Sequence, residues 1–136
     1  MPRGEDVYEA TTRELTVRVR PTYLDGQSDP AARRWVWAYA IEIENGGDET
    51  VQLVSRHWII TDAWGRTEEV RGPGVVGEQP ILKPGDRYAY ASGCPLTTSS
   101  GSMVGTYQMV TNGGEAFEIA IPHFSLDTPS AGRVVN

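Results

Sequence analysis

Three glycines in residues 69–80 have the spacing G-x-G-x-x-G that occurs in dinucleotide-binding domains: Gly72, Gly74 and Gly77. In those domains the glycines join a strand to a helix, and the pyrophosphate of the ligand lies against the N-terminus of that helix. Here Pro80 and Pro84 follow the glycines, and proline disfavours a helix at both positions. The sequence therefore argues against a nucleotide site of the Rossmann type.

The glycine loop keeps two other interpretations. In the first it is a surface loop between two sheets, in which glycine supplies unusual φ angles and Val75 or Val76 packs into the core. In the second its backbone N–H groups converge on a phosphate or pyrophosphate. The residues of this anion site would be Gly72, Gly74, Val75, Val76 and Gly77, assisted by Arg66 and Arg71. We favour the first, because Pro73 lacks an N–H group and Glu78 would repel an anion.

Ser55 and His57 alternate onto one face of an expected strand, with Asp62 and Glu68 further along the chain. A serine nucleophile with a histidine base is the arrangement of many hydrolases. However, the strand has no sharp turn that would expose the serine. We therefore expect no enzymatic activity and assign no catalytic residue.

Metal ligands are scarce. His57, His123 and Cys94 are far apart and lack zinc-site spacing. Asp62, Glu68 and Glu69 could supply carboxylates to magnesium, but acidic residues near a turn are usually just solvated. We expect no metal site and no cofactor.

The elements that would position these residues are strands. Residues 35–44 alternate strictly, which places Trp37, Tyr39 and Ile41 on an inner face. Similar patterns predict strands at 15–19, 51–62, 67–71, 88–90, 102–110 and 116–122, separated by glycine, proline and asparagine turns. We predict an all-β, immunoglobulin/fibronectin-type-III-like antiparallel β-sandwich of seven to eight strands over residues 1–126, followed by a flexible tail over 127–136.

Composition and charge argue against several classes of function. The 136 residues contain 12 Lys plus Arg and 18 Asp plus Glu, and the net charge of −6 argues against general binding to nucleic acid. No apolar run is long enough to cross a membrane. The first 15 residues carry charges where a signal peptide is apolar, and a single cysteine cannot form an intrachain disulfide. We expect a cytoplasmic protein with no membrane contact.

Three motifs occur together in this order: the run Ser55-Arg56-His57-Trp58, the glycine loop, and a closing run over residues 121–126. In this order and spacing they resemble the ApaG family over residues 8–126. The resemblance implies a fibronectin-type-III-like sandwich in a cytosolic bacterial protein, often encoded beside a diadenosine tetraphosphatase. It also implies a link to cobalt and magnesium resistance without an established catalytic activity. Many members have an acidic residue where this chain has Pro73.

Related domains in eukaryotic F-box and polymerase-associated proteins resemble interaction modules. We therefore expect a non-enzymatic module that binds an unidentified protein partner, and the alternative is a pyrophosphate or nucleotide binder that uses the glycine loop. Strands 15–19 and 117–121 are expected at exposed sheet edges, where a second copy could pair to form a homodimer.

Overall fold

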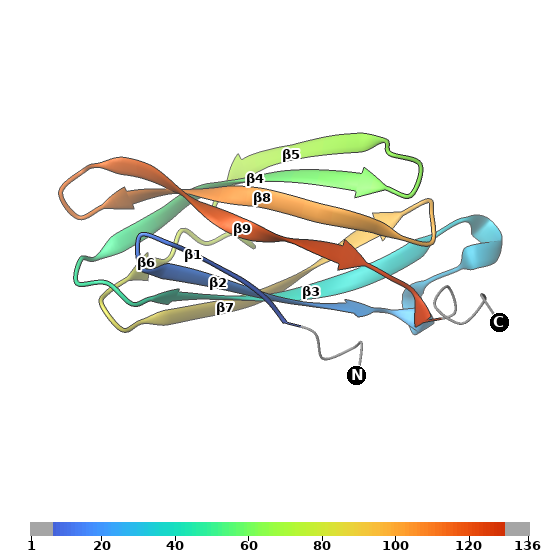
Figure 1. The fold of residues 1–136 in the computed structure, drawn as a ribbon, viewed down its shortest axis with the longest axis horizontal. Coiled ribbons are helices and arrows are strands. Elements are labelled where there is room, and N and C mark those ends of the chain that lie inside the picture. The colour runs from blue at the N-terminus through green and yellow to red at the C-terminus, as the bar shows by residue number, and fades with distance from the viewer. Residues whose placement is uncertain (1–6, 130–136) are drawn as a thin grey trace.

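Alternating apolar and polar side chains produce two antiparallel sheets that pack face to face (Figure 1). The structure, a computed structural model, describes residues 7–129. Its strands are β1 (Tyr8–Thr12), β2 (Leu15–Tyr23), β3 (Trp35–Asn45), β4 (Val51–Asp62), β5 (Thr67–Pro73), β6 (Ile81–Leu82), β7 (Arg87–Leu96), β8 (Gly101–Thr111) and β9 (Ala116–Leu126). Two short 3₁₀ turns, η1 (Asp25–Gln27) and η2 (Pro30–Ala32), lie between β2 and β3.

One sheet has the strand order β1-β2-β3-β7, and the other has the order β5-β4-β8-β9 with β6 paired to the start of β4. The predicted all-β antiparallel sandwich is therefore confirmed. Strand β1 adds an element that we did not expect, because Tyr8–Thr12 has too few apolar residues to show a clear alternation. Strand β6 is only two residues long.

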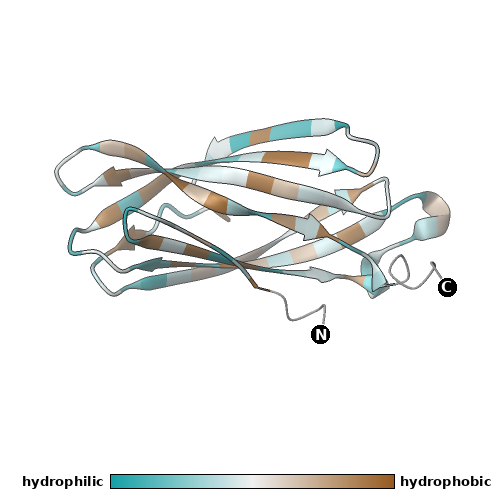
Figure 2. Cartoon of the chain, viewed as in Figure 1, coloured by the Kyte–Doolittle hydropathy of each residue, from teal (hydrophilic) through white to brown (hydrophobic). Residues whose placement is uncertain are grey.

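The core lies between the sheets, and Figure 2 shows apolar bands alternating with polar ones along the strands. Trp37, Tyr39 and Ile41 are buried as predicted, and Ile43 is buried with them. Trp35, at the start of the same strand, is only partly buried. On β4 and β9, Trp58 and Phe124 pack against Tyr39 from the facing sheet, with ring centroids 5.4 and 5.9 Å from its ring.

One of the two predictions of an edge strand is wrong. Strand β2, which contains residues 15–19, lies between β1 and β3 and is not at an edge. The other, β9, does lie at an edge, but the backbone N–H of Ala120 donates to the Thr12 hydroxyl of β1 at 3.1 Å. On the opposite side of the sandwich, β5 and β7 each have one neighbour within the described part of the chain. These two strands therefore form the open side.

A β-bulge in β4 decides which way its side chains point. Leu53 pairs with Met109 and Ser55 pairs with Gln108, so Val54 is an extra residue in this strand. Leu53 before the bulge and Trp58 after it are both buried, although they are five positions apart and strict alternation would place them on opposite faces. As a consequence Arg56, which shares the face of Trp58, extends toward the space between the sheets.

The end of the domain is held by Trp37, whose indole N–H donates to the carbonyl oxygen of Asp127 at 2.9 Å. Thr128 is also buried. Asp127 and Thr128 belong to the segment that we expected to be a flexible tail. Residues 130–136 of that segment lie outside the described residues.

Candidate functional site

The glycine loop forms a tight hairpin directly after β5. The N–H of Val75 donates to the carbonyl of Glu78, and the N–H of Glu78 donates to the carbonyl of Val75, both at 2.8 Å. Between them, Val76 and Gly77 have φ angles of 42° and 83°. Two central residues with positive φ are typical of a type I′ turn. Val75 is fully buried and Val76 is 56% exposed, which agrees with the expectation that one of the two valines packs into the core.

The polar groups of this loop are turned toward the protein itself. The N–H of Gly74 donates to the carbonyl of Val54 at 2.8 Å, so the donors of Gly74, Val75 and Glu78 all have intrachain partners. The carbonyls of Pro73 and Gly74 accept hydrogen bonds from Nη1 of Arg56, each at 2.9 Å. A loop that offers carbonyls to a guanidinium and uses these N–H groups to bond its own turn and β4 gives little support to an anion site.

The two arginines that the anion interpretation assigns to the loop are bonded to other residues. Arg66 lies in the turn between β4 and β5, at the opposite end of β5 from the loop, and its Nε donates to Asp62 at 2.7 Å. Arg71 is on the exposed face of β5, where it approaches Glu69 at 3.4 Å. The loop instead contacts Arg56. Alternation places Arg56 on the face of Trp58, but the sequence does not show that its side chain reaches the loop.

Arg56 is partly buried, and its charge acts on a nearby pair of tyrosines. The hydroxyls of Tyr90 on β7 and Tyr107 on β8 are hydrogen-bonded across the two sheets. Burial raises the pKa of both phenols, and the positive charge of Arg56 opposes this only weakly. Both phenols therefore stay protonated at neutral pH, and Arg56 and the tyrosines together link the sheets to the glycine loop.

Ser55 and His57 lie on the exposed face of β4, and each is bonded to a different neighbour. The Ser55 hydroxyl donates to Gln108 Oε1 at 2.8 Å, and His57 Nε2 lies 2.8 Å from Glu69 Oε1. The hydrogen bond from His57 lowers the pKa of the Glu69 carboxyl, with a smaller contribution from Arg71. Asp62 is the last residue of β4 and Glu68 is on β5, and they do not join this pair. Within residues 7–129 no group of three or more His, Cys, Asp or Glu could hold a metal ion.

The turn between β4 and β5 presents a large exposed aromatic ring. The Asp62 carboxylate accepts the backbone N–H groups of Trp64 and Arg66 at 2.9 and 3.0 Å, and Ala63 N–H donates to the buried Thr98 hydroxyl at 3.1 Å. These bonds fix the turn while the Trp64 side chain stays 63% exposed. Among the described residues, Trp64 is the most exposed of the large hydrophobic side chains.

Two guanidinium groups approach the Trp64 ring. Cζ of Arg66 lies 4.5 Å from the ring centroid, and Cζ of Arg33 lies 5.6 Å from it. Arg33 follows η2 in a left-handed conformation with φ 58° and ψ 45°, so it comes from a different turn. Cation–π contacts of this kind contribute about 0.5–1 kcal/mol each when exposed.

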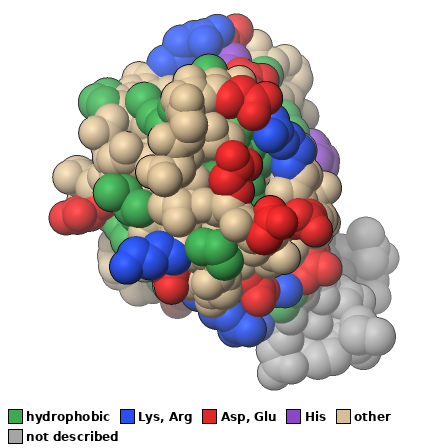
Figure 3. Space-filling model, turned by 90° about the vertical axis from the view of Figure 1, so that its left-hand side faces the viewer, with side chains coloured by type: hydrophobic (Ala, Val, Ile, Leu, Met, Phe, Trp, Pro, Cys, Tyr) green, Lys and Arg blue, Asp and Glu red, His purple; other side chains and the backbone are tan. Residues whose placement is uncertain are grey.

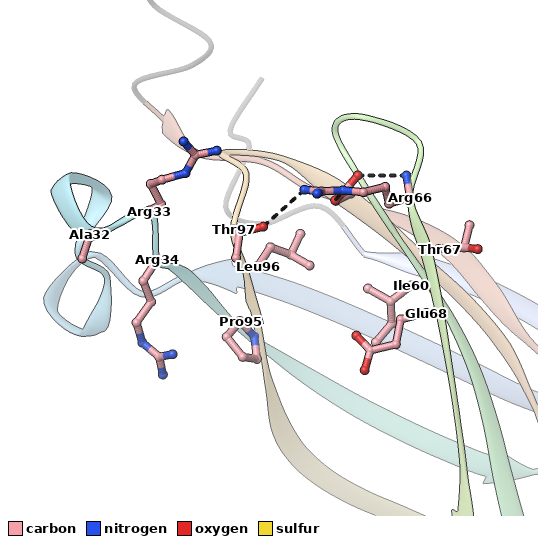
Figure 4. Close-up of a pocket in the computed structure, with 11 residues that line it drawn as sticks. Ala32, Arg33, Arg34, Ile60, Arg66, Thr67, Glu68, Pro95, Leu96 and Thr97 are labelled. Atoms are coloured by element: carbon pink, nitrogen blue, oxygen red, sulfur yellow. Dashed lines mark hydrogen bonds and ion pairs between the residues drawn. The ribbon is translucent and has the colours of Figure 1, made fainter.

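Beside the ring is an open groove of about 550 Å³, which we call the basic groove. Figure 4 shows the side chains of Arg33 and Arg66 extending toward each other near Thr97, while Arg34 points away from them. The apolar part of its lining comes from Ile60, Pro95 and Leu96. We missed this groove because its residues come from three segments that are distant in sequence, within residues 32–34, 60–68 and 95–97. One sequence feature could have indicated the groove: Trp64 lies between Asp62 and Arg66 in an expected turn.

The opposite end of the sandwich carries several acidic side chains. Figure 3, which views that end, shows carboxylate side chains gathered on it. The turns there supply Glu14, Asp48, Glu49 and Glu115, and Arg13 is paired with Glu115 at 3.2 Å. No helix within residues 7–129 has the length and apolar character needed to span a membrane.

Comparisons with known proteins agree on one family. Residues 25–111 match the family model described as the ApaG domain. The chain is 61% identical to Protein ApaG of Mesorhizobium japonicum over 130 residues, which is 96% of this chain and all of that protein. It is 63% identical to Protein ApaG of Rhodospirillum centenum over 123 residues, covering 90% of this chain and 95% of that protein.

Solved structures give the same result. A crystal structure of an ApaA protein from Bordetella pertussis superposes with a TM-score of 0.83 at 51% identity, covering 85% of this chain and 94% of that one. The C-terminal domain of wzt, at 8% identity and a TM-score of 0.51, shares the fold alone. The sequence motifs, the sandwich and these relatives lead to one conclusion: this chain belongs to the ApaG family.

Proposed function

We propose that this ApaG domain is a non-enzymatic interaction module that binds a protein partner through the end that carries Trp64. The observation that carries this proposal is the exposed Trp64 ring with the guanidinium groups of Arg33 and Arg66 beside it. Tryptophan and arginine are the residues that most often dominate the binding energy of protein interfaces. A turn fixed by the Asp62 carboxylate presents the ring without a large loss of conformational freedom on binding.

The hydrogen bonding of Ser55 and His57 supports the non-enzymatic part of the proposal. A serine nucleophile needs its hydroxyl bonded to the histidine base. Here the serine hydroxyl donates to Gln108, and the histidine nitrogen is bonded to Glu69.

We also propose that the domain acts in the cytoplasm. Cys94 is a free and buried thiol, and burial raises its pKa to about 11. A protonated, inaccessible thiol is a poor nucleophile, and a single cysteine without a disulfide fits a reducing compartment.

A site-specific photo-crosslinker tests the main proposal. It is placed at position 64 and, in a matched control, at Ile81, which is also exposed and lies away from the Trp64 turn. We expect one protein to be captured from cell extract at position 64 and not at position 81, and to bind the purified domain. Trp64→Ala should then weaken binding by about 2 kcal/mol or more, which is roughly 30-fold. Arg71→Ala, which removes an exposed arginine elsewhere, should leave the affinity unchanged.

Unchanged affinity of Trp64→Ala for the captured partner would contradict the proposal.

Homodimerisation is a separate proposal. Within residues 7–129, β5 and β7 each have one edge without a paired strand, and each edge could accept a strand from a second copy. We expect light scattering to give the mass of a dimer at micromolar concentration, and a monomer up to about 100 μM would exclude this contact.

A further inference from the structure

The basic groove places two guanidinium groups beside one aromatic ring. Arg33 and Arg66 both approach the ring of Trp64. Asp62 neutralises Arg66 at 2.7 Å, whereas neither Arg33 nor Arg34 has an ion-pair partner among residues 7–129. The chain as a whole has a net charge of −6, so this gathering of arginines runs against the average composition. Converging guanidinium groups repel each other, and a bound anion would remove that repulsion.

The other residues that line the groove indicate what a bound ligand should contain besides a negative charge. The Thr97 hydroxyl accepts a hydrogen bond from Arg66 Nη2 at 3.5 Å, so its own hydrogen is free to be donated to an anion. Ile60, Pro95 and Leu96 supply an apolar surface in the same groove. A ligand that carries a carboxylate next to an apolar group could therefore contact both the polar and the apolar lining of this groove.

The carboxylates of the groove favour a single negative charge over a multiply charged one. Asp62 and Glu68 are part of the lining together with the arginines. A phosphate carries up to two negative charges and would be repelled by both carboxylates more strongly than a carboxylate ligand would. This distinguishes the groove from a nucleotide site, in spite of the aromatic ring.

We propose that the basic groove binds an acidic segment of a protein partner. A carboxylate of that segment is held by Arg33, Arg66 and the Thr97 hydroxyl beside Trp64, and the adjacent apolar side chain packs on Leu96. Arginine binds carboxylates well because its planar fork can donate two parallel hydrogen bonds. This inference rests on the proposed function and adds the chemistry of the partner.

Three peptide probes of equal length test it. The first carries one glutamate followed by one leucine in a glycine-serine background, the second replaces the glutamate by glutamine, and the third replaces the leucine by serine. Binding is followed by the NMR shift of the Trp64 indole N–H, assigned by its loss in Trp64→Phe. We expect the glutamate-leucine peptide to bind at least about tenfold more tightly than either of the others, which corresponds to about 1.4 kcal/mol. Arg33→Gln should remove this preference, and Arg71→Gln should keep it.

Equal binding of the glutamate and glutamine peptides would overturn the inference. So would displacement of the peptide by pyrophosphate or ATP at lower concentration than by the glutamate peptide itself, which would assign the groove to phosphates. If a partner is captured at position 64 but the peptides show no preference for glutamate, the acidic inference fails while the proposed function stands. The melting temperature of Arg33→Gln, compared with that of the wild-type protein, shows whether the variant is folded.

Discussion

Replacement of Gly74 by alanine should destabilise the domain far more than the same change at Gly77, although both glycines belong to the G-x-G-x-x-G spacing. Both have positive φ, 58° at Gly74 and 83° at Gly77. A left-handed conformation costs a residue with a Cβ about 1–2 kcal/mol. This contribution is common to the two variants.

The difference lies in what the new Cβ would meet. At Gly74 it would lie 2.1 Å from the carbonyl oxygen of Glu78, whereas at Gly77 nothing is within 4 Å. The contact at Gly74 forces the hairpin open and breaks the two hydrogen bonds between Val75 and Glu78. Each is worth about 0.5–1.5 kcal/mol net. We therefore expect about 2–5 kcal/mol for Gly74→Ala and about 1–2 kcal/mol for Gly77→Ala.

Urea unfolding followed by far-ultraviolet circular dichroism measures both values, with an unchanged m-value as the check on two-state behaviour. For a domain of this size the expected losses correspond to about 3–4 °C in melting temperature per kcal/mol. Equal costs for the two variants, or a cost below about 1 kcal/mol at Gly74, would refute the reasoning. In that case the turn is not closed by the bonds described, and the glycines would have to be explained by a ligand.

Four further predictions concern other parts of the molecule. Val76→Asn should stabilise the domain by roughly 0.5–1 kcal/mol in urea unfolding, because asparagine tolerates the positive φ that a β-branched residue resists; any loss of stability contradicts this. Ile41→Ala should cost about 2–5 kcal/mol by the same method, since Ile41 lies in the core, and a cost under about 0.5 kcal/mol would mean that its burial is misassigned. Hydrogen bonds from basic side chains lower the pKa of the Glu44, Glu69 and Glu115 carboxyls below 4.5, so thermal unfolding should show their contribution intact above pH 4.5 and lost progressively below it; a melting temperature independent of pH between 5 and 3 would contradict this. Pyrophosphate at millimolar concentration should give no thermal shift, whereas saturation at about 100 times a dissociation constant would add about 2.7 kcal/mol and would restore the anion interpretation of the glycine loop.

The sandwich could be predicted from sequence because long strands carry strong alternation. In β3 the large side chains of Trp37, Tyr39 and Ile41 recur every second residue, and the structure buries all three. The edges could not be predicted with the same success. Residues 8–12 carry a weak pattern, and their pairing with β2 converts an expected edge into an interior strand. A short strand is specified mainly by its neighbour, which the local sequence does not contain.

The candidate site was harder to predict than the fold, for two physical reasons. Arg33, Trp64 and Thr97 belong to three different turns, and only the closure of the sandwich brings them to one end. The side chain of Arg56 turns inward because of one additional residue in β4, and strict alternation contains no sign of that residue. Alternation indicates which residues of a strand share a face, but it does not show where a bulge shifts that alternation.

The bulge at Val54 has a consequence for how the length of this chain can vary. Removal of Val54 would make the ladder between β4 and β8 continuous and would leave Ser55 and every later side chain of β4 on its present face. Flattening the bulge with Val54 retained would have the opposite effect, because unbroken alternation from Leu53 would turn His57 toward the core and Trp58 toward solvent. Insertions and deletions are therefore tolerated in the turns of this domain, whereas a single residue added elsewhere in β4 needs a bulge of its own to keep the later side chains in place.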